Sequence, residues 1–235
     1  MTRDPLTPRP QFDAYAADYD AALERGISVS GEDKEFFARG RVHWLARQLA
    51  ELGESPERIL DFGCGTGTGA HHLGEQYPKA AVLGTDLSGS SLETARRRYG
   101  GERVQFRLTS ELAPAGEIDL AFCNGVFHHI PLAERAGAMK WIHQSLHSEG
   151  LFAFWENNPW NPGTRFVMSR IPFDRDAITL TPPESRRLLS TGGFEIVRTD
   201  FLFFFPRWLG WLRRIEPRLA GLPMGAQYLV LARKR

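Results

Sequence analysis

Short apolar runs alternate along this chain with longer segments whose apolar residues recur at helical spacing. The runs predict strands at 59–62, 80–85, 104–108, 118–123, 151–155, 194–205 and 227–232. Between and before them, the sequence predicts helices at 28–52, 66–77, 90–99, 131–146 and 181–192. Strands that alternate with helices indicate a parallel, doubly wound α/β sheet. We expect the last two strands to form an antiparallel hairpin at the sheet edge.

Capping residues mark several of the predicted helix ends. Hydroxyls and acids at 28–33 suit the start of the helix at 28–52, and Gly53 suits its C-terminal cap. Ser90 with Glu93, and Thr181 with Glu184, have the spacing of capping boxes. These signals divide the chain into elements without suggesting an internal repeat.

The length of 235 residues fits one domain with additions. We expect a flexible tail at 1–10, a helical cap at 11–54, a core at 56–205 and 227–235, and an insertion at 206–226 over the cleft. Phe12, Tyr15 and Tyr19 share one face of a helix in the cap. Two interpretations of this face are open, a helix pinned to the core or a lid whose tyrosines face a ligand.

Composition excludes several classes of protein. A net charge of +1 provides no electrostatic footprint for nucleic acid. Cys64 and Cys123 are not spaced as a disulfide framework or a metal site, and no other spacing suggests a metal. The first residues have no apolar signal-peptide core, and no apolar run approaches the roughly 18 residues of a membrane span. We therefore expect a reduced, cytoplasmic setting.

A glycine-rich turn after the first strand carries the strongest chemical signal. Asp61 ends that strand, Gly63, Gly65 and Gly67 follow, and Asp86 ends the next strand. Glycines allow a tight turn and close approach of a ligand, and an acid after the second strand can accept hydrogen bonds from ribose hydroxyls. Residues 65–70 also fit the dinucleotide pattern G-x-G-x-x-G/A, so an NAD-dependent oxidoreductase is one alternative.

Three features favour another nucleotide. A pyrophosphate gains nothing from the carboxylate of Asp61, whereas a ligand with an ammonium group does. Two predicted helices precede the first strand, and a hairpin ends the chain. The motifs D-F-G-C-G-T-G at 61–67, T-D-L-S at 85–88 and F-C-N-G-V-F-H-H-I-P at 122–131 resemble those of class I, Rossmann-like S-adenosylmethionine-dependent methyltransferases. The resemblance runs in order over about residues 56–156.

The resemblance implies a seven-stranded sheet with an antiparallel last strand, and S-adenosylmethionine lying across the strand ends, with S-adenosylhomocysteine as product. It also implies a position for each part of the cofactor. The residues assigned to the methionine portion are Asp61, Gly63, Cys64, Gly65 and Gly67; to the ribose, Asp86; to adenine, Leu87, Thr109 and Ser110; to the region beside the sulfonium, Asn124, Gly125 and Val126. Tyr15 and Tyr19 join this set if the cap acts as a lid. Arg41 joins it if its guanidinium binds a carboxylate, with a solvated arginine as the alternative. Thr109 and Ser110 stand where the family often has an acid.

The ends of the fourth and fifth strands suggest a catalytic base. His128 and His129 follow the fourth strand, and Glu156 ends the fifth. A carboxylate that orients an imidazole forms a base dyad, and such a base assists methyl transfer to a hydroxyl. The structural alternative is that one histidine caps the helix at Pro131 and Glu156 binds backbone or cofactor. We interpret four further histidines, at 71, 72, 143 and 147, as structural or surface residues.

A stretch rich in asparagine and proline follows the fifth strand. We interpret residues 157–165 as a substrate loop that includes Asn157, Asn158 and Trp160, with a stiff connection as the alternative. An N-P-P-[FYW] tetrad marks methyltransferases that act on flipped bases, but that tetrad follows the fourth strand and is only partly matched here. The neutral charge also argues against nucleic acid.

Residues 201–214 combine aromatic side chains with arginine. A buried strand and short helix over the cleft is the leading interpretation; contact with a membrane interface and a dimer interface are the alternatives. The leading hypothesis for function is methyl transfer to a small-molecule hydroxyl. A lipid or lipid-linked glycan acceptor and a non-catalytic cofactor-binding module are the alternatives, and the oligomeric state is open.

Overall fold

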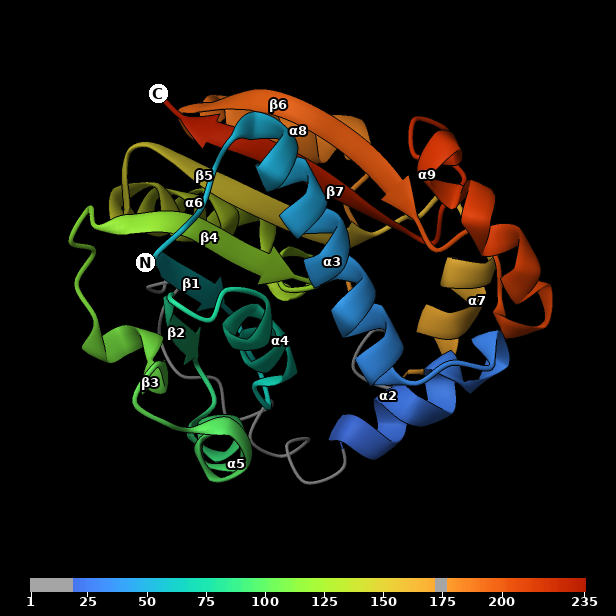
Figure 1. Cartoon of the computed structure of the whole chain (residues 1–235), viewed down its shortest axis with the longest axis horizontal. Helices are drawn as coiled ribbons and strands as arrows, with labels where there is room; N and C mark the ends of the chain where they lie inside the picture. The colour runs from blue at the N-terminus through green and yellow to red at the C-terminus, as the bar shows by residue number, and fades with distance from the viewer. Residues whose placement is uncertain (1–18, 172–176) are drawn as a thin grey trace.

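A single mixed sheet organises the molecule, as Figure 1 shows. The computed structural model describes residues 19–171 and 177–235. The seven strands lie in the order β3-β2-β1-β4-β5-β7-β6. Their bounds are β1 Arg58–Phe62, β2 Ala81–Asp86, β3 Val104–Leu108, β4 Ile118–Asn124, β5 Leu146–Asn157, β6 Phe194–Leu202 and β7 Gln227–Lys234. Strand β7 is antiparallel to both β5 and β6, while β1 to β5 are parallel. The doubly wound sheet with an antiparallel last strand is confirmed.

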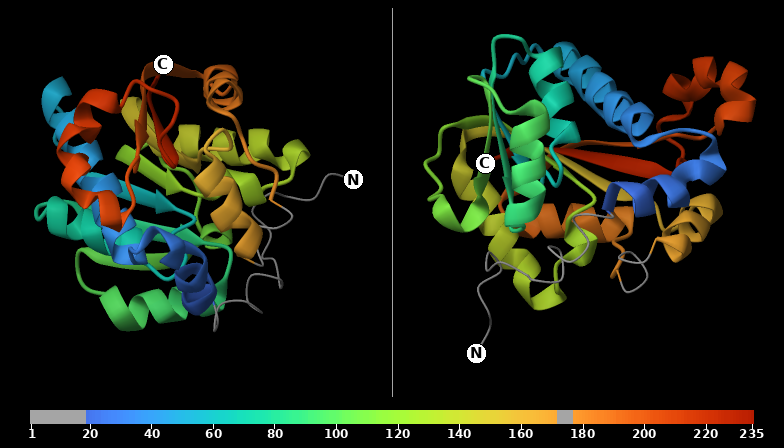
Figure 2. Two further views of the ribbon diagram at one scale, coloured as in Figure 1. Left: turned by 90° about the vertical axis from the view of Figure 1, so that its right-hand side faces the viewer. Right: turned by 90° about the horizontal axis from the view of Figure 1, so that it is seen from below.

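Helices cover both faces of this sheet, as the two views in Figure 2 show. One face is covered by α3 Lys34–Leu52, α4 Thr68–Gln76 and α5 Gly89–Tyr99, and the other by α6 Leu132–Ser145 and α8 Pro182–Thr191. The other helices in the described residues are α2 Tyr19–Ile27, α7 Pro162–Arg170 and α9 Glu216–Leu219, with 3₁₀ segments η1 Ser28–Ser30, η2 Thr109–Glu111, η3 Phe127–His129 and η5 Arg207–Ile215. The predicted helix with Phe12 and Tyr15 lies outside the described residues.

The alternation of side chains along each strand produces two separate cores. On β1, Ile59 packs under α3 and α4, whereas the next residue, Leu60, packs under α6. Phe152 and Ala153 divide in the same way on β5. Because successive strand residues point to opposite faces, a strand buried on both sides is apolar throughout. This explains why the central strands read as continuous apolar runs.

Two of the predicted helix starts were wrong. The segment at 28–52 is not one helix, because Gly31 adopts a left-handed conformation (φ 77°) and Asp33 caps α3 by accepting from the amide of Phe36. Helix α5 is capped by Ser88, which accepts from the amide of Ser91, so the capping box at Ser90 is absent. Gly53 ends α3 as predicted (φ 75°), and the capping box of Thr181 and Glu184 is confirmed.

Three further boundaries differ from the prediction. Strand β5 extends to residues 146–157, because its first residue pairs with Ile118 across a register shift. Strand β6 ends at Leu202, and the left-handed Phe203 (φ 62°) turns the chain away from the sheet. Pro162 starts helix α7, whose N-cap is Asn161, so only the first part of 157–165 is a loop.

The helices α2 and α7 and the segment η5 to α9 gather at one end of the sheet, on the right of Figure 1. The carboxyl ends of the parallel strands point toward this end. In doubly wound sheets ligands bind beyond these strand ends. Within the described parts of the chain, no helix combines the length and apolar character that crossing a membrane requires.

Candidate active site

The glycine turn joins β1 to α4 beside the end of β2. The amides of Gly63 and Cys64 both donate to the carbonyl of Thr85, at 2.7 and 2.9 Å. Gly63, Gly65 and Gly67 all have positive φ, which explains why side chains with a Cβ are disfavoured. A Cβ on Gly63 collides with Val126, whereas one on Gly65 points into open space. The backbone of Gly65 is therefore open to a ligand.

Two acids lie at the turn in different environments. The carboxylate of Asp86 accepts from the amides of Gly65 and Ser88, both at 2.9 Å. Asp61 is 3% exposed, and its Oδ2 has no hydrogen-bond partner among the described residues. Burial, followed by the charge of Asp86, raises the pKa of Asp61 to about 7. A buried carboxyl oxygen without a donor fits a ligand that brings a cationic ammonium group.

The other predicted cofactor residues lie along the same edge. Because β1, β2 and β4 are neighbours, the positions of Asp61, Asp86 and Asn124 meet at adjacent strand ends. Leu87, Gly125 and Val126 are partly exposed there. After β3, Thr109 is buried and Ser110 is exposed. Cys64 is buried, and burial raises the pKa of its thiol. Tyr15 lies outside the described residues, and Tyr19 is placed only as the first residue of α2.

A histidine–carboxylate pair lies at the ends of β4 and β5. The Nδ1 atom of His128 is 2.6 Å from Oε2 of Glu156, and both side chains are almost fully buried. A carboxylate only accepts hydrogen bonds, so Nδ1 carries the proton and Nε2 is the basic nitrogen. The other oxygen of Glu156 accepts from the amides of Phe127 and His128, at 2.9 and 3.3 Å. Glu156 thus combines the backbone contact and the dyad contact that the sequence left as alternatives.

Residues that the sequence analysis missed hold this pair in place. The carbonyl of His128 accepts from the amide of Ile178 at 2.9 Å. Arg135, on α6, donates to the carbonyls of Ile130 and Ile178 at 3.0 and 2.6 Å. The buried guanidinium therefore fastens the segment that carries both histidines. Arg135 is one of several arginines in the sequence, and no local pattern distinguishes it.

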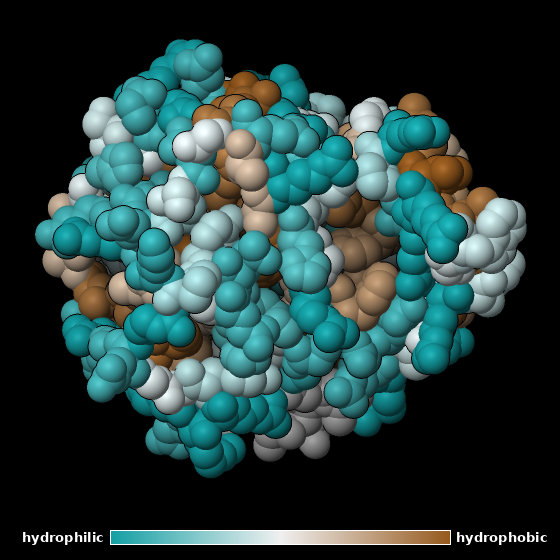
Figure 3. All heavy atoms as spheres, in the orientation of Figure 1, coloured by the Kyte–Doolittle hydropathy of each residue, from teal (hydrophilic) through white to brown (hydrophobic). Residues whose placement is uncertain are grey.

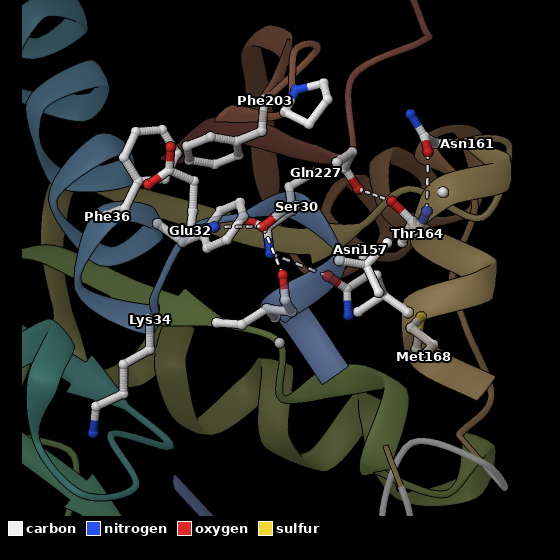
Figure 4. A pocket seen from close by; sticks show the side chains of 18 of the residues that line it. Ser30, Glu32, Lys34, Phe36, Asn157, Asn161, Thr164, Met168, Phe203 and Gln227 are labelled. Carbon is white, nitrogen blue, oxygen red and sulfur yellow. Dashed lines mark hydrogen bonds between the residues drawn. The ribbon is translucent and has the colours of Figure 1, made fainter. Parts of the chain in front are cut away.

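A cavity of about 410 Å³ opens beside His128. Its walls come from α2, η1, α3, α7 and η5, and Figure 3 shows apolar surface inside the hollow on this side of the molecule. In the close view of Figure 4, Phe36 and Phe203 lie together on one wall and Met168 lies on another. The rings of Phe37 and Phe203 meet edge to face, with centroids 5.0 Å apart. Most of the wall is apolar.

The floor of the cavity is polar. Arg41, which is buried, donates from Nη1 to Oε1 of Gln227 at 2.8 Å, and Gln227 in turn donates to Oδ1 of Asn157 at 3.1 Å. Asn124, His128 and His129 line the same end. The sequence had placed Arg41 and Asn157 in the site, but Gln227 starts the last strand and had no motif to mark it. The cavity thus suits a molecule with an apolar body and one polar end.

Asn158 and Trp160 lie away from this floor. Asn158 is fully buried, and its amide donates to the carbonyls of Pro223 and Gly225 at 3.1 and 2.8 Å. Its Oδ1 accepts from the amide of Trp160, whose own side chain is 48% exposed. Asn158 therefore connects the start of α7 with the insertion. Neither side chain lines the cavity.

The histidines on α4 form a separate cluster. Both ring nitrogens of His72 face carboxylates, Nε2 at 2.6 Å from Glu35 and Nδ1 at 2.9 Å from Glu75. The ligand atoms of His71, His72 and Glu75 lie within 4.8 Å of one another, a grouping that the sequence analysis did not identify. The pair of His72 with Glu35 links α4 to α3. His71 stacks on Tyr99, with ring centroids 4.5 Å apart.

Comparisons with known proteins agree with this geometry. A family model described as a methyltransferase domain matches residues 60–152. A malonyl-[acyl-carrier protein] O-methyltransferase from Legionella pneumophila is 35% identical over 121 residues, which cover 50% of this chain and 38% of the relative. A trans-aconitate 2-methyltransferase from Methylobacterium nodulans is 38% identical over 96 residues, covering 40% of this chain and 37% of that protein. The chain thus matches less than half the length of both.

The fold is shared over almost the whole chain. The magnesium protoporphyrin IX methyltransferase of Synechocystis, solved with bound S-adenosylhomocysteine, superposes with a TM-score of 0.65 over 97% of this chain and 98% of that one, at 18% identity. The fold of the chain is that of class I, Rossmann-like S-adenosylmethionine-dependent methyltransferases, and residues 60–152 match the methyltransferase-domain model. S-adenosylmethionine is the cofactor that this family uses, and the open Gly65 backbone and the unpaired oxygen of Asp61 fit it.

Proposed function

We propose that this chain transfers a methyl group from S-adenosylmethionine to an oxygen of a small molecule with a largely apolar body. The observation that carries the proposal is the buried pair of His128 and Glu156, of which His128 lines a largely apolar cavity. The cofactor supplies a methyl group already activated on a sulfonium. The protein then has to bind and align the two substrates and exclude water. Where the methyl acceptor is a hydroxyl, the protein also has to take up its proton.

The residues at the glycine turn hold the cofactor in this proposal. Asp61 and the backbone at 63–67 bind its methionine portion, and Asp86 binds the ribose hydroxyls. Leu87, Thr109 and Ser110 lie toward adenine, and Asn124 to Val126 lie between the cofactor and the cavity. Arg41 lines the cavity and also lowers the pKa of Asp61 through its charge, which supports a close approach of the two sites.

The dyad favours a hydroxyl acceptor. Glu156 accepts a hydrogen bond from Nδ1 of His128 and fixes the ring, so in this proposal Nε2 is the basic nitrogen that takes a proton from the acceptor. A carboxylate acceptor arrives without a proton and needs no base. Base assistance contributes about 10²–10⁴-fold where it acts. Loss of the base should therefore slow methyl transfer to a hydroxyl but not to a carboxylate.

A carboxylate acceptor is the second candidate. Arg41 on the cavity floor favours it, because guanidinium groups bind carboxylates through paired hydrogen bonds. The names of the two relatives also contain carboxylic acids, trans-aconitate and a malonyl group. The hydroxyl proposal rests on His128, and the carboxylate proposal on Arg41.

An acceptor screen separates these proposals from each other and from a non-catalytic module. The chain is incubated with S-adenosylmethionine and with paired apolar alcohols, phenols and carboxylic acids, and the methylated products are detected by mass spectrometry. With a hydroxyl acceptor we expect His128→Asn to lose most of the product. An undiminished yield in that variant contradicts the role of the dyad. If no acceptor gives product while S-adenosylhomocysteine binds, the non-catalytic module is favoured.

A further inference from the structure

The insertion beside the cavity exposes large apolar side chains. Trp208 is 74% exposed and Trp211 is 72% exposed, three residues apart on η5. Ile215, Leu222 and Met224 are exposed in the same insertion, and Phe166 is exposed on α7. Single exposed apolar residues are common, but two exposed tryptophans with several apolar neighbours in one segment indicate a binding surface.

The same surface carries an excess of positive charge. Residues 162–170 and 203–226 contain six arginines and one acid, Glu216, in a chain with 29 basic and 28 acidic residues. Glu216 accepts from the amide of Phe205, at 3.1 Å. Arg213 is paired with Glu32, whereas Arg207, Arg214 and Arg218 are exposed. The charge of these two segments is therefore strongly positive although the chain as a whole is almost neutral.

The two segments are fastened to each other around the mouth of the cavity. Asn161 donates to the carbonyl of Met224 at 2.6 Å, and Thr164 donates to the carbonyl of Ala226 at 2.7 Å. Trp208 and Phe166 both line the cavity as well as being exposed. In the views of Figure 2, η5 and α7 lie at the same end of the molecule but apart from each other, and both line the cavity. The exposed apolar residues and the arginines thus lie around the mouth of one cavity.

We propose that this aromatic–arginine surface, made by Trp208, Trp211, Phe166, Arg207, Arg214 and Arg218, binds bilayers that contain anionic lipids. Tryptophan concentrates at the level of the lipid headgroups, where its ring is buried and its N–H stays hydrated. Arginines around it are attracted to anionic headgroups. The exposed Arg207 directly precedes Trp208, and the exposed Arg214 follows Trp211 by three residues, so positive charge lies beside the exposed rings.

The placement has a consequence for access to the cavity. A bilayer bound at this surface lies at the cavity mouth, so an apolar acceptor can enter without crossing water. Entry of the acceptor from the bilayer rests on the proposed function, whereas the lipid binding itself does not. The binding experiment needs neither cofactor nor acceptor, so its failure is distinct from the failure of methyl transfer.

Vesicle co-sedimentation of the full chain tests the proposal. One set of vesicles is phosphatidylcholine alone, and the other contains about one third phosphatidylglycerol. We expect binding to the anionic vesicles, weakened by salt, with loss of most of it in the double variant Trp208→Ala/Trp211→Ala. Arg214→Gln/Arg218→Gln weakens it roughly 25-fold, since each arginine near the surface contributes about fivefold.

Matched substitutions away from the surface serve as controls. Leu52→Ala changes an exposed apolar residue at the far end of α3, and Arg97→Gln changes an exposed arginine on α5. Both variants keep wild-type binding if the proposal is correct. Absence of binding to anionic vesicles overturns it, as does binding that the tryptophan pair does not affect. If sedimentation velocity instead shows self-association that the Trp208→Ala/Trp211→Ala variant abolishes, the surface is an interface between copies of this chain.

Discussion

The Nδ1 atom of His128 lies 2.6 Å from Oε2 of Glu156, and the backbone amide of the same histidine approaches the other oxygen of that carboxylate at 3.3 Å. One buried carboxylate thus fixes both the ring and the main chain of His128. The two residues come from the ends of neighbouring strands, β4 and β5. The sheet therefore places the basic nitrogen beside the cavity with little freedom of movement.

Replacing His128 tests its role as a base. For a hydroxyl substrate we expect His128→Asn to lower turnover by about 10²–10⁴-fold. Without the imidazole, no base takes the hydroxyl proton in the transition state. The affinity for S-adenosylhomocysteine should stay near the wild-type value. Steady-state kinetics and calorimetry measure the two quantities separately.

His147→Asn is the matched control, because His147 is 43% exposed and pairs with Asp119 at the opposite end of the sheet. Glu156→Gln provides a second variant. Its amide nitrogen cannot accept, so it loses either the ring contact or the backbone contact of the native carboxylate. Normal turnover in both His128→Asn and Glu156→Gln is incompatible with a dyad.

The pKa of Asp61 predicts that cofactor binding depends on pH. Burial raises this pKa to about 7, so the free protein is increasingly protonated at Asp61 below pH 7. A cationic ligand favours the carboxylate, so its binding releases a proton. Affinity for S-adenosylhomocysteine should therefore rise between pH 5.5 and 7 and level off above that. Calorimetry in two buffers of different ionisation enthalpy measures the proton release.

Asp61→Asn removes the titrating group and is the control for this dependence. Its affinity should be lower and independent of pH over the same range. The linkage for folding has the opposite sign: since the folded pKa is raised, stability falls as the pH rises from about 4 to 7. An affinity that is equal at pH 5.5 and pH 8 in the wild-type chain would count against the assigned role of Asp61.

Asn158 and Trp160 are adjacent in the loop but should behave differently. Asn158→Ala removes the donor to the buried carbonyl of Gly225 and to the partly buried carbonyl of Pro223, and an unsatisfied buried group costs about 1–3 kcal/mol of stability. Trp160→Ala removes an exposed side chain, with an expected change within about 0.5 kcal/mol. Chemical denaturation measures both. Equal effects would show that the Asn158 amide does not hold the insertion.

The sequence predicted those features that local patterns encode. The seven strands appear as apolar runs because the sheet is buried on both faces, and the glycine turn with Asp61 and Asp86 has a fixed local spacing. The pairing of His128 with Glu156 could also be predicted from the sequence. It follows from strand order, since both residues stand at the ends of strands that are neighbours in this topology.

Contacts between distant segments were beyond prediction. Asn158 binds carbonyls 65 and 67 residues away, and Arg41 meets Gln227 across 186 residues. The start of α7 was missed because Pro162 stiffens a loop and begins a helix equally well, and only Asn161 as N-cap distinguishes the two. The N-caps of α3 and α5 are Asp33 and Ser88 rather than the predicted residues. Several consecutive residues at each position can cap a helix, so the sequence does not determine which one does.

The central claim is that the glycine turn, with Asp86, binds the nucleoside of S-adenosylmethionine. Calorimetric titration of S-adenosylhomocysteine into wild type, Asp86→Ala and the exposed control Glu93→Ala tests it most directly. Asp86→Ala loses hydrogen bonds to a charged acceptor, which are worth about 1.5–3 kcal/mol each, so its affinity should fall at least about tenfold while Glu93→Ala matches the wild type. Unchanged affinity in a folded Asp86→Ala variant, or tighter binding of NADH than of S-adenosylhomocysteine, would contradict the account.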